Sequence, residues 1–203
     1  MNCRSAKREK GFSLLEAVVV LGIMMALAGL AIIQSFGSRE SYIANSALDT
    51  VVGQLRLARE LAIAQRRDVV ITIVTNPAPG QTPHVDYQIK APVGAAAEKD
   101  GPVVSAALPQ AASFMLTPGV PDTPMAFGNN SAVYIGNVSG GPINMRFTST
   151  GQFTDSTDVN PINGTLFMGI TNLNNPAYAR AVTIMGGTGR VRPYSYTGLH
   201  WNN

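Results

Sequence analysis

The sequence predicts an α+β protein in which one long N-terminal helix packs on a body of antiparallel β-strands. Three observations predict this class. No proline interrupts residues 12–67, so one helix can run through that range. From residue 68 onward, short β-branched stretches alternate with turn-forming stretches. The 20 glycines and 13 prolines favour a body rich in turns. Segregation of one helix from many strands defines the α+β class.

The basic character of the chain belongs to its first eleven residues. The chain has 15 basic and 12 acidic residues. Residues 1–11 hold one of the acidic residues and four of the basic ones, Arg4, Lys7, Arg8 and Lys10, so the remainder has 11 of each sign. The single cysteine, Cys3, lies there too. If this segment is removed, the rest can form no disulfide.

The apolar stretch from Phe12 to Ile33 predicts a membrane-spanning helix. At 1.5 Å per residue it spans roughly 30 Å, the thickness of a bilayer's hydrocarbon core. The basic residues before it predict a cytoplasmic N-terminus and an extracytoplasmic body. A secretory signal peptide is an alternative, although its apolar core is shorter. A plain single-pass anchor is another, but it leaves the charged Glu16 unexplained.

Residues 34–67 form the amphipathic half of the predicted helix. Apolar residues recur at steps of three and four, which places them on one helix face: Ala44, Leu48, Val51, Leu55, Ala58 and Ala62. Arg56, Arg59 and Glu60 lie largely off that stripe. We expect the stripe to pack on the body. Two helices with a break near Gly37 and Ser38 are an alternative.

The body is predicted to span residues 68–203 as a series of short strands. Strand patterns occur at 68–76, 85–90, 113–117, 132–137, 143–150, 165–171, 179–186 and 190–196. A turn at 149–155 re-enters a short strand, and residues 186–189 ("GGTG") join the last two strands. Residues 91–111 show little periodicity and predict an exposed loop.

The stretch "KGFSLLE" (10–16) resembles the type IV prepilin signal, and the whole layout resembles the minor pilins and pseudopilins of the GspH/FimT family. Supporting stretches are the end of the helix at 55–69, "FTSTGQ" (147–152) and "VTIMGGTGRVRPY" (182–194). The resemblance implies a pilin-like fold, with a basic leader (1–11) that a prepilin peptidase removes between Gly11 and Phe12. Phe12 would then be N-methylated, and residues 12–33 would form the filament core.

The resemblance also gives Glu16 a role. It would pair with the terminal amine of a neighbouring subunit, because an ammonium and a carboxylate attract strongly in a low dielectric. Alternatively, Glu16 lies near the interface and reaches the lipid headgroups. The implied function is a subunit of a type IV pilus or of a type II secretion pseudopilus. Its partners would be other pilins and the inner membrane, with the C-terminal domain in the periplasm, or at the cell surface in a pilus.

Enzymatic chemistry has little support in the sequence. The only histidines are His84 and His200, and the pair His84 with Asp86 is most simply a loop feature. The acidic pairs Glu98/Asp100 and Asp155/Asp158 lie in polar segments, where solvated surface is the ordinary interpretation and weak calcium binding the alternative. We therefore expect no catalytic residue, no metal site and no cofactor. A membrane-anchored enzyme or sensor is a remote third class.

A C-terminal basic hairpin suggests a second function, DNA binding for uptake in natural transformation. Residues 159–203 contain no acidic residue. They contain three arginines, Arg180, Arg190 and Arg192, with aromatic residues nearby that would suit a nucleic-acid surface: Tyr178, Tyr194, Tyr196, His200 and Trp201. Arg190 and Arg192 would point to the same side of a strand, and Gly189 allows a tight turn. "GRVR" (189–192) also resembles a motif of FimT-type pilins that is associated with DNA. That resemblance implies Gly189, Arg190 and Arg192 as contact residues. The alternative is a purely structural hairpin with exposed arginines.

Overall fold

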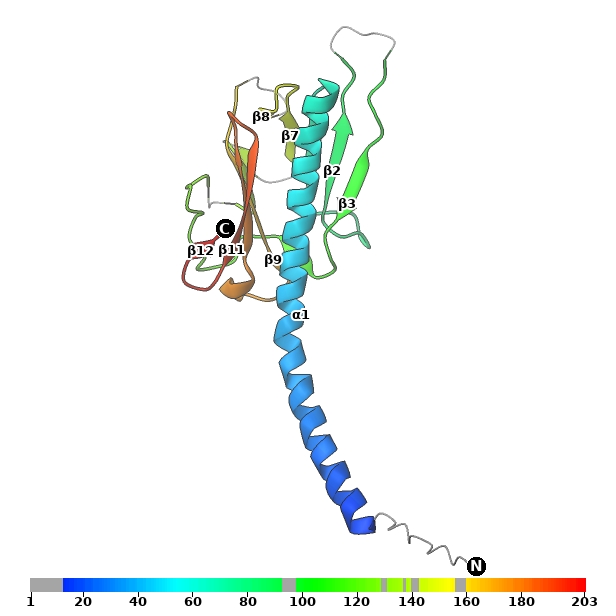
Figure 1. The fold of residues 1–203 in the computed structure, drawn as a ribbon. Helices are drawn as coiled ribbons and strands as arrows, with labels where there is room; N and C mark the ends of the chain where they lie inside the picture. The colour runs from blue at the N-terminus through cyan, green and yellow to red at the C-terminus, as the bar shows by residue number, and fades with distance from the viewer. Residues whose placement is uncertain (1–12, 93–97, 129–130, 137, 140–142, 156–159) are drawn as a thin grey trace, which may run out of the picture. The chain divides into compact units, whose positions relative to one another are not determined.

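A computed structural model describes residues 13–92, 98–128, 131–136, 138–139, 143–155 and 160–203, without the side chains of residues 30–38 and 138–139. The predicted leader, 1–11, and Phe12 lie outside these ranges. The chain divides into two compact units, Met1–Arg39 and Glu40–Asn203. One helix, α1 (Leu14–Gln65), contributes to both units. Figure 1 shows α1 in blue to cyan.

The second unit contains the strands, which form two antiparallel sheets. The first sheet has the order β3-β2-β1-β7-β8 and consists of β1 (Val69–Val74), β2 (His84–Ile89), β3 (Val104–Ala107), β7 (Ile143–Phe147) and β8 (Phe153–Asp155). The second sheet has the order β12-β11-β10-β9-β5-β6, and β4 also pairs with β9. Its strands are β4 (Ala112–Phe114), β5 (Val133–Ile135), β6 (Val138–Ser139), β9 (Gly164–Ile170), β10 (Arg180–Met185), β11 (Arg190–Tyr196) and β12 (Trp201–Asn202). A short 3-10 helix, η1 (Pro176–Tyr178), precedes β10.

The amphipathic half of α1 packs as its sequence predicts. All six residues of the apolar stripe are buried: Ala44, Leu48, Val51, Leu55, Ala58 and Ala62. Arg56 and Glu60 are exposed, and Arg59 is half-buried. Because alanine side chains are small, the strands can approach the helix closely at these positions. Burial of the stripe stabilises the helix more than its intrinsic propensity does.

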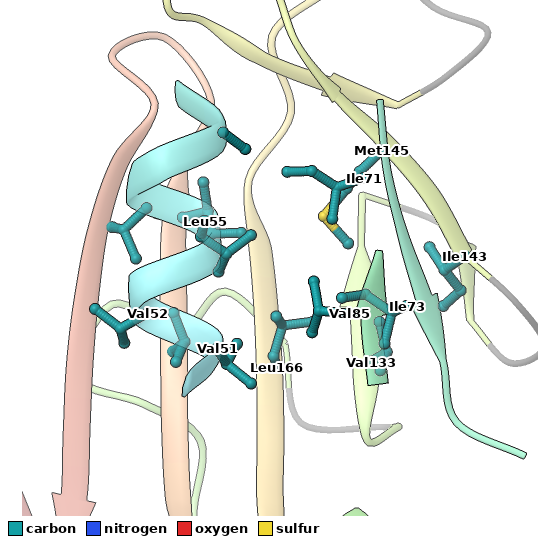
Figure 2. Packing of buried hydrophobic residues seen from close by; sticks show 14 of the residues in the cluster. Val51, Val52, Leu55, Ile71, Ile73, Val85, Val133, Ile143, Met145 and Leu166 are labelled. Carbon is teal, nitrogen blue, oxygen red and sulfur yellow. The ribbon is translucent and has the colours of Figure 1, made fainter. Parts of the chain in front are cut away.

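The core of the second unit lies where α1 meets both sheets. Figure 2 shows Val51 and Leu55 of α1 together with side chains of both sheets. Ile71 and Met145 come from the first sheet, and Leu166 comes from the second. These five residues are at most 1% exposed. One continuous cluster therefore holds the helix and the two sheets together.

The second sheet is covered on both faces. Every residue of β9 is buried, which is typical of a strand with packing on each side. Part of the segment 91–130, for which the sequence suggested no role, provides the outer cover. The indole N–H of Trp201 donates to the carbonyl of Pro121 at 3.0 Å. A side chain at Gly128 would lie 2.2 Å from the ring of Tyr134, so this glycine allows close contact with β5.

In the first unit, the described part of α1 exposes its large apolar side chains. Those at least 41% exposed are Leu14, Leu15, Val18, Val19, Val20, Leu21, Ile23, Met24, Met25 and Leu27. Among the residues described, no helix combines the length and the apolar character needed to cross a membrane.

The α+β class is confirmed, and most strand patterns lie within two residues of an observed strand. The strand predicted at 190–196 coincides with β11. The turn at 149–155 leads into β8, as expected. The prediction that 91–111 is a loop is wrong at Val104–Ala107, which forms β3 and pairs with β2. The strand patterns predicted one antiparallel sheet, whereas the strands divide between two sheets.

Candidate functional site

The prepilin-type signal precedes and enters α1. Gly11 and Phe12 lie outside the described residues, so cleavage and methylation at these positions stay predictions. Glu16 lies in the first turn of α1, and its side chain is exposed. A carboxylate at this place interacts favourably with the positive end of the helix dipole. Its exposure leaves it free to contact a group from outside the chain.

The predicted contact residues Gly189, Arg190 and Arg192 lie on the β10–β11 hairpin. The strands pair Met185 with Arg190 and Thr183 with Arg192. The N–H of Gly189 donates to the carbonyl of Met185 at 2.7 Å and closes the turn. Gly189 has a φ of +60°, in the left-handed region that favours glycine. The hairpin expected from "GGTG" is therefore confirmed.

Gly189 is required by packing as well as by the turn. A Cβ at this position would lie 2.1 Å from the carbonyl oxygen of Gly151 and 2.9 Å from Nε of Arg59. Nε of Arg59 donates to the carbonyl of Thr188 at 3.1 Å. The hairpin tip thus lies directly against α1 and the turn at Gly151. The close packing around residue 189 therefore explains why a glycine is found there, without any contact to a ligand.

The two arginines of "GRVR" have different surroundings. Alternate residues of a strand point to the same side, so Arg190 and Arg192 share a side of β11. Arg190 is exposed. Arg192 is half-buried, and its Nε is fully buried with no hydrogen-bond partner among the described residues. Only Arg190 is therefore fully available to an outside ligand.

Arg180, which the sequence grouped with these arginines, has a structural role. It is 5% exposed. Its Nε donates to Oδ1 of Asn45 on α1, and its Nη1 donates to the carbonyls of Ala177 and Ala179, each at 2.9 Å. Desolvation by burial lowers the pKa of Arg180 below its usual value. Arg180 joins β10 to the helix and cannot reach a ligand in solvent.

The aromatic residues near the hairpin pack against one another. The ring centroids of Tyr194 and Tyr196 lie 6.5 Å and 5.1 Å from that of Trp201. Tyr194 and Tyr196 are 4% and 7% exposed. The expectation that these aromatics would accompany the arginines at a nucleic-acid surface is not met, because stacking on bases needs exposed rings.

A pocket of about 480 Å³ lies between α1 and the hairpin tip. Its lining includes three arginines, Arg56, Arg59 and Arg190, and one carboxylate, Glu60. Within the described residues, no carboxylate forms an ion pair with any of the three arginines. The sequence pattern placed Arg56 and Arg59 off the buried stripe but gave no sign that they lie near Arg190. The i, i+3 spacing of two arginines on an exposed helix face was the available signal.

The other residues considered for chemistry have ordinary partners. Nε2 of His84 lies 3.7 Å from Oδ2 of Asp86, and Nδ1 of His84 hydrogen-bonds with the carbonyl of Thr82 at 2.9 Å. Glu98 forms an ion pair with Arg67, and Asp100 forms one with Lys90. These pairings leave Glu98 and Asp100 as parts of ion pairs, not as two free ligands for calcium. Asp158, from the other acidic pair, lies outside the described residues.

Comparison with known proteins identifies the N-terminal signal. Residues 6–32 match the family described as the prokaryotic N-terminal methylation motif. The match contains Gly11, Phe12 and Glu16, and it supports the predicted resemblance to minor pilins and pseudopilins. The motif implies processing by a peptidase and assembly with other pilins.

Among solved structures, a crystal structure of the type IV minor pilin FimU from Pseudomonas aeruginosa (strain PAO1) matches this chain, with a TM-score of 0.41 and 16% sequence identity. The alignment covers 79% of this chain and 92% of that one. No conclusion rests on a similarity of this size. No curated protein matches the sequence significantly.

Proposed function

We propose that the protein is a minor pilin or pseudopilin that assembles through its N-terminal helix into a filament. The observation that carries this proposal is the methylation motif at residues 6–32, which continues into the apolar start of α1. Large apolar side chains exposed along residues 14–27 of an isolated chain support it, because such surfaces are usually covered by a partner or by lipid. Before assembly the chain would be anchored in the inner membrane, with its body in the periplasm.

Glu16 has a specific part in the proposed assembly. Cleavage after Gly11 would create an α-ammonium group on Phe12, four residues before Glu16. In a packed bundle within lipid, an unpaired carboxylate is costly, whereas one paired with an ammonium of a neighbouring subunit is far less so. The pair would therefore fix the axial register of neighbouring helices. The exposed position of Glu16 in the single chain is compatible with such a contact.

The experiment that tests this proposal compares Glu16→Ala with the unchanged protein in cells. We expect Glu16→Ala to be cleaved after Gly11 normally but to be depleted about tenfold or more from sheared filaments, since loss of a buried charge pair's partner costs several kcal/mol. Mass spectrometry of the mature N-terminus measures cleavage and methylation. Asp49→Ala, an exposed carboxylate farther along α1, is the matched control. Normal incorporation of Glu16→Ala, or an uncleaved Met1, would contradict the proposal.

The type of filament stays open between a type IV pilus and a type II secretion pseudopilus. Both would use the same N-terminal signal and the same helix. Cross-linking in the membrane followed by identification of the partner subunits would distinguish them.

DNA binding at the β10–β11 hairpin is a second candidate function. The observation that favours it is Arg190, which is exposed beside Arg56 and Arg59 in a pocket with a single carboxylate. Half-burial of Arg192 and the packing of Gly189 weaken the part of the proposal that rests on the "GRVR" motif as a unit. A few phosphate contacts bind weakly and only at low salt, so several subunits of a filament would have to act together.

A further inference from the structure

The pocket between α1 and the β10–β11 hairpin holds an excess of positive charge that the fold does not use. Arg56, Arg59 and Arg190 line it, and Glu60 is the one acidic residue in the lining. Salt bridges within the protein normally reduce such an excess. In the described part of the chain none reaches these three arginines. The charge is therefore available to an anion from outside.

A neighbouring basic pocket shows the opposite arrangement. Its lining includes four basic residues, and three of them, Arg67, Lys90 and Arg146, form ion pairs. Their partners are Glu98, Asp100 and Asp68, respectively. The two pockets meet at one turn, since Ser149 lines the second and Gly151 contacts the residues of the first. Ion pairs thus offset most of the positive charge in the second pocket, whereas no ion pair among the described residues offsets that of the first.

The arginines are held in a geometry that suits an oxyanion. Arg56 and Arg59 are three residues apart and share a face of α1. Nε of Arg59 donates to the carbonyl of Thr188, which fixes the guanidinium at the pocket while leaving its terminal N–H groups free to donate. Gly189, which has no side chain, leaves room for this contact. Arg190 lines the same pocket from β11.

We propose that Arg56, Arg59 and Arg190 form a binding site for a phosphate-type oxyanion. Guanidinium forks match phosphate oxygens in shape and charge. The remaining lining residues, Met185, Thr188, Gly189 and Val191, include no aromatic ring, so the site recognises the anionic group and not a base. A volume of about 480 Å³ accommodates a phosphate with its waters or one phosphodiester of a chain. The oxyanion site does not depend on the second candidate function. Only its assignment to the phosphates of a nucleic-acid backbone rests on that function.

The test uses inorganic phosphate and the full chain in neutral detergent. Binding is followed through the arginine side-chain N–H signals in NMR spectra and through calorimetry. We expect saturable binding that weakens about tenfold in Arg56→Gln and in Arg190→Gln, because each removes a charge-assisted hydrogen bond. Glu60→Gln should strengthen binding about threefold by removing the single carboxylate. Lys99→Gln, an exposed cation outside the pocket lining, is the control and should change nothing.

The Glu60→Gln variant protects the test against misfolding, because damaged protein does not bind more tightly. Absence of saturable binding, or binding that the three pocket variants leave unchanged, would overturn the proposal.

A short DNA duplex then identifies the source of the phosphate. If the duplex competes with phosphate, and the slope of log affinity against log salt falls by about 0.9 for each arginine removed, the site takes a nucleic-acid backbone. If phosphate binds and the duplex does not compete, the site binds a free phosphate ion, and DNA binding at this pocket is contradicted. Duplex binding that is independent of all three arginines would retain DNA binding but overturn this site.

Discussion

Gly187 and Gly189 lie two residues apart in one turn, and only Gly187 leaves room for a side chain. A Cβ on Gly187 would meet no atom within 4 Å, whereas one on Gly189 would overlap the carbonyl oxygen of Gly151. At the scale of single residues, "GRVR" is thus three different things. Gly189 is a packing residue, Arg190 is an exposed cation, and Arg192 is half-buried with a fully buried Nε.

This contrast predicts the stability of two alanine variants. Gly189→Ala should lower the free energy of unfolding by about 2–4 kcal/mol, because it combines a left-handed backbone with a steric overlap. Gly187→Ala should stay within about 0.5 kcal/mol of the unchanged protein. Urea denaturation of both variants measures the difference. Equal stability of the two would mean that the hairpin tip does not lie against the turn at Gly151.

At the scale of elements, the sequence correctly predicted the helices and strands whose apolar residues recur with a clear period. The buried stripe of α1 follows the helical period through Ala58 and Ala62, and β11 begins and ends where its alternation does. The strand β3 was missed because its residues, Val104 to Ala107, are small and mostly exposed, so no face of it stands out. Its pairing with β2 comes from backbone hydrogen bonds, which the sequence does not display.

For the candidate site too, the sequence could predict features made by neighbouring residues but not contacts between residues far apart in the chain. The sequence could place Arg190 on a hairpin, because the glycines of the turn are local. It could not bring Arg56 and Arg59 to that hairpin, since about 130 residues separate the helix from the hairpin and the two meet only in the folded chain. It also could not show that Arg180 is buried against Asn45, which lies 135 residues earlier.

The connection between β2 and β3 should depend on pH through Asp100. The hydrogen bond from Lys90, followed by the one from the backbone N–H of Ala91, lowers the pKa of Asp100 below its usual value of 3.8. A carboxyl with a lowered pKa in the folded state stabilises the fold above its unfolded pKa, and this contribution is lost as the pH falls through the folded pKa. The loss should therefore occur below about pH 4.

The measurement compares the melting temperature of Asp100→Asn with that of the unchanged protein from pH 7 down to pH 2. We expect the variant to melt slightly lower at pH 7 and the two curves to converge below about pH 4. In a Lys90→Met background, Asp100→Asn should have a smaller effect, because the hydrogen bond from Lys90, which lowers the pKa of Asp100 most, is gone. A difference that persists unchanged to pH 2 would argue against the contribution of Asp100.

At the scale of the whole molecule, the two units differ in what they need from their surroundings. The second unit, Glu40–Asn203, contains every residue of the main core cluster. The described helix of the first unit exposes a continuous series of large apolar side chains, such as Leu14 at 83% and Met25 at 72%. Surfaces of this kind associate with lipid or with one another, whereas a closed core does not require either. Folding and assembly would thus belong to different parts of the chain.

This division predicts that a chain starting at Glu40 folds without detergent as a monomer and unfolds in one cooperative transition. Sedimentation velocity measures its size, and near-UV circular dichroism during urea denaturation follows its tertiary packing. Leu55→Ala in this shortened chain is the control, and it should lose about 2–5 kcal/mol because Leu55 is fully buried in the core. A shortened chain that lacks near-UV signal and binds hydrophobic dyes would mean that residues before Glu40 contribute to the fold. If it folds while the full chain aggregates without detergent, the exposed apolar helix is an assembly element that the body does not need.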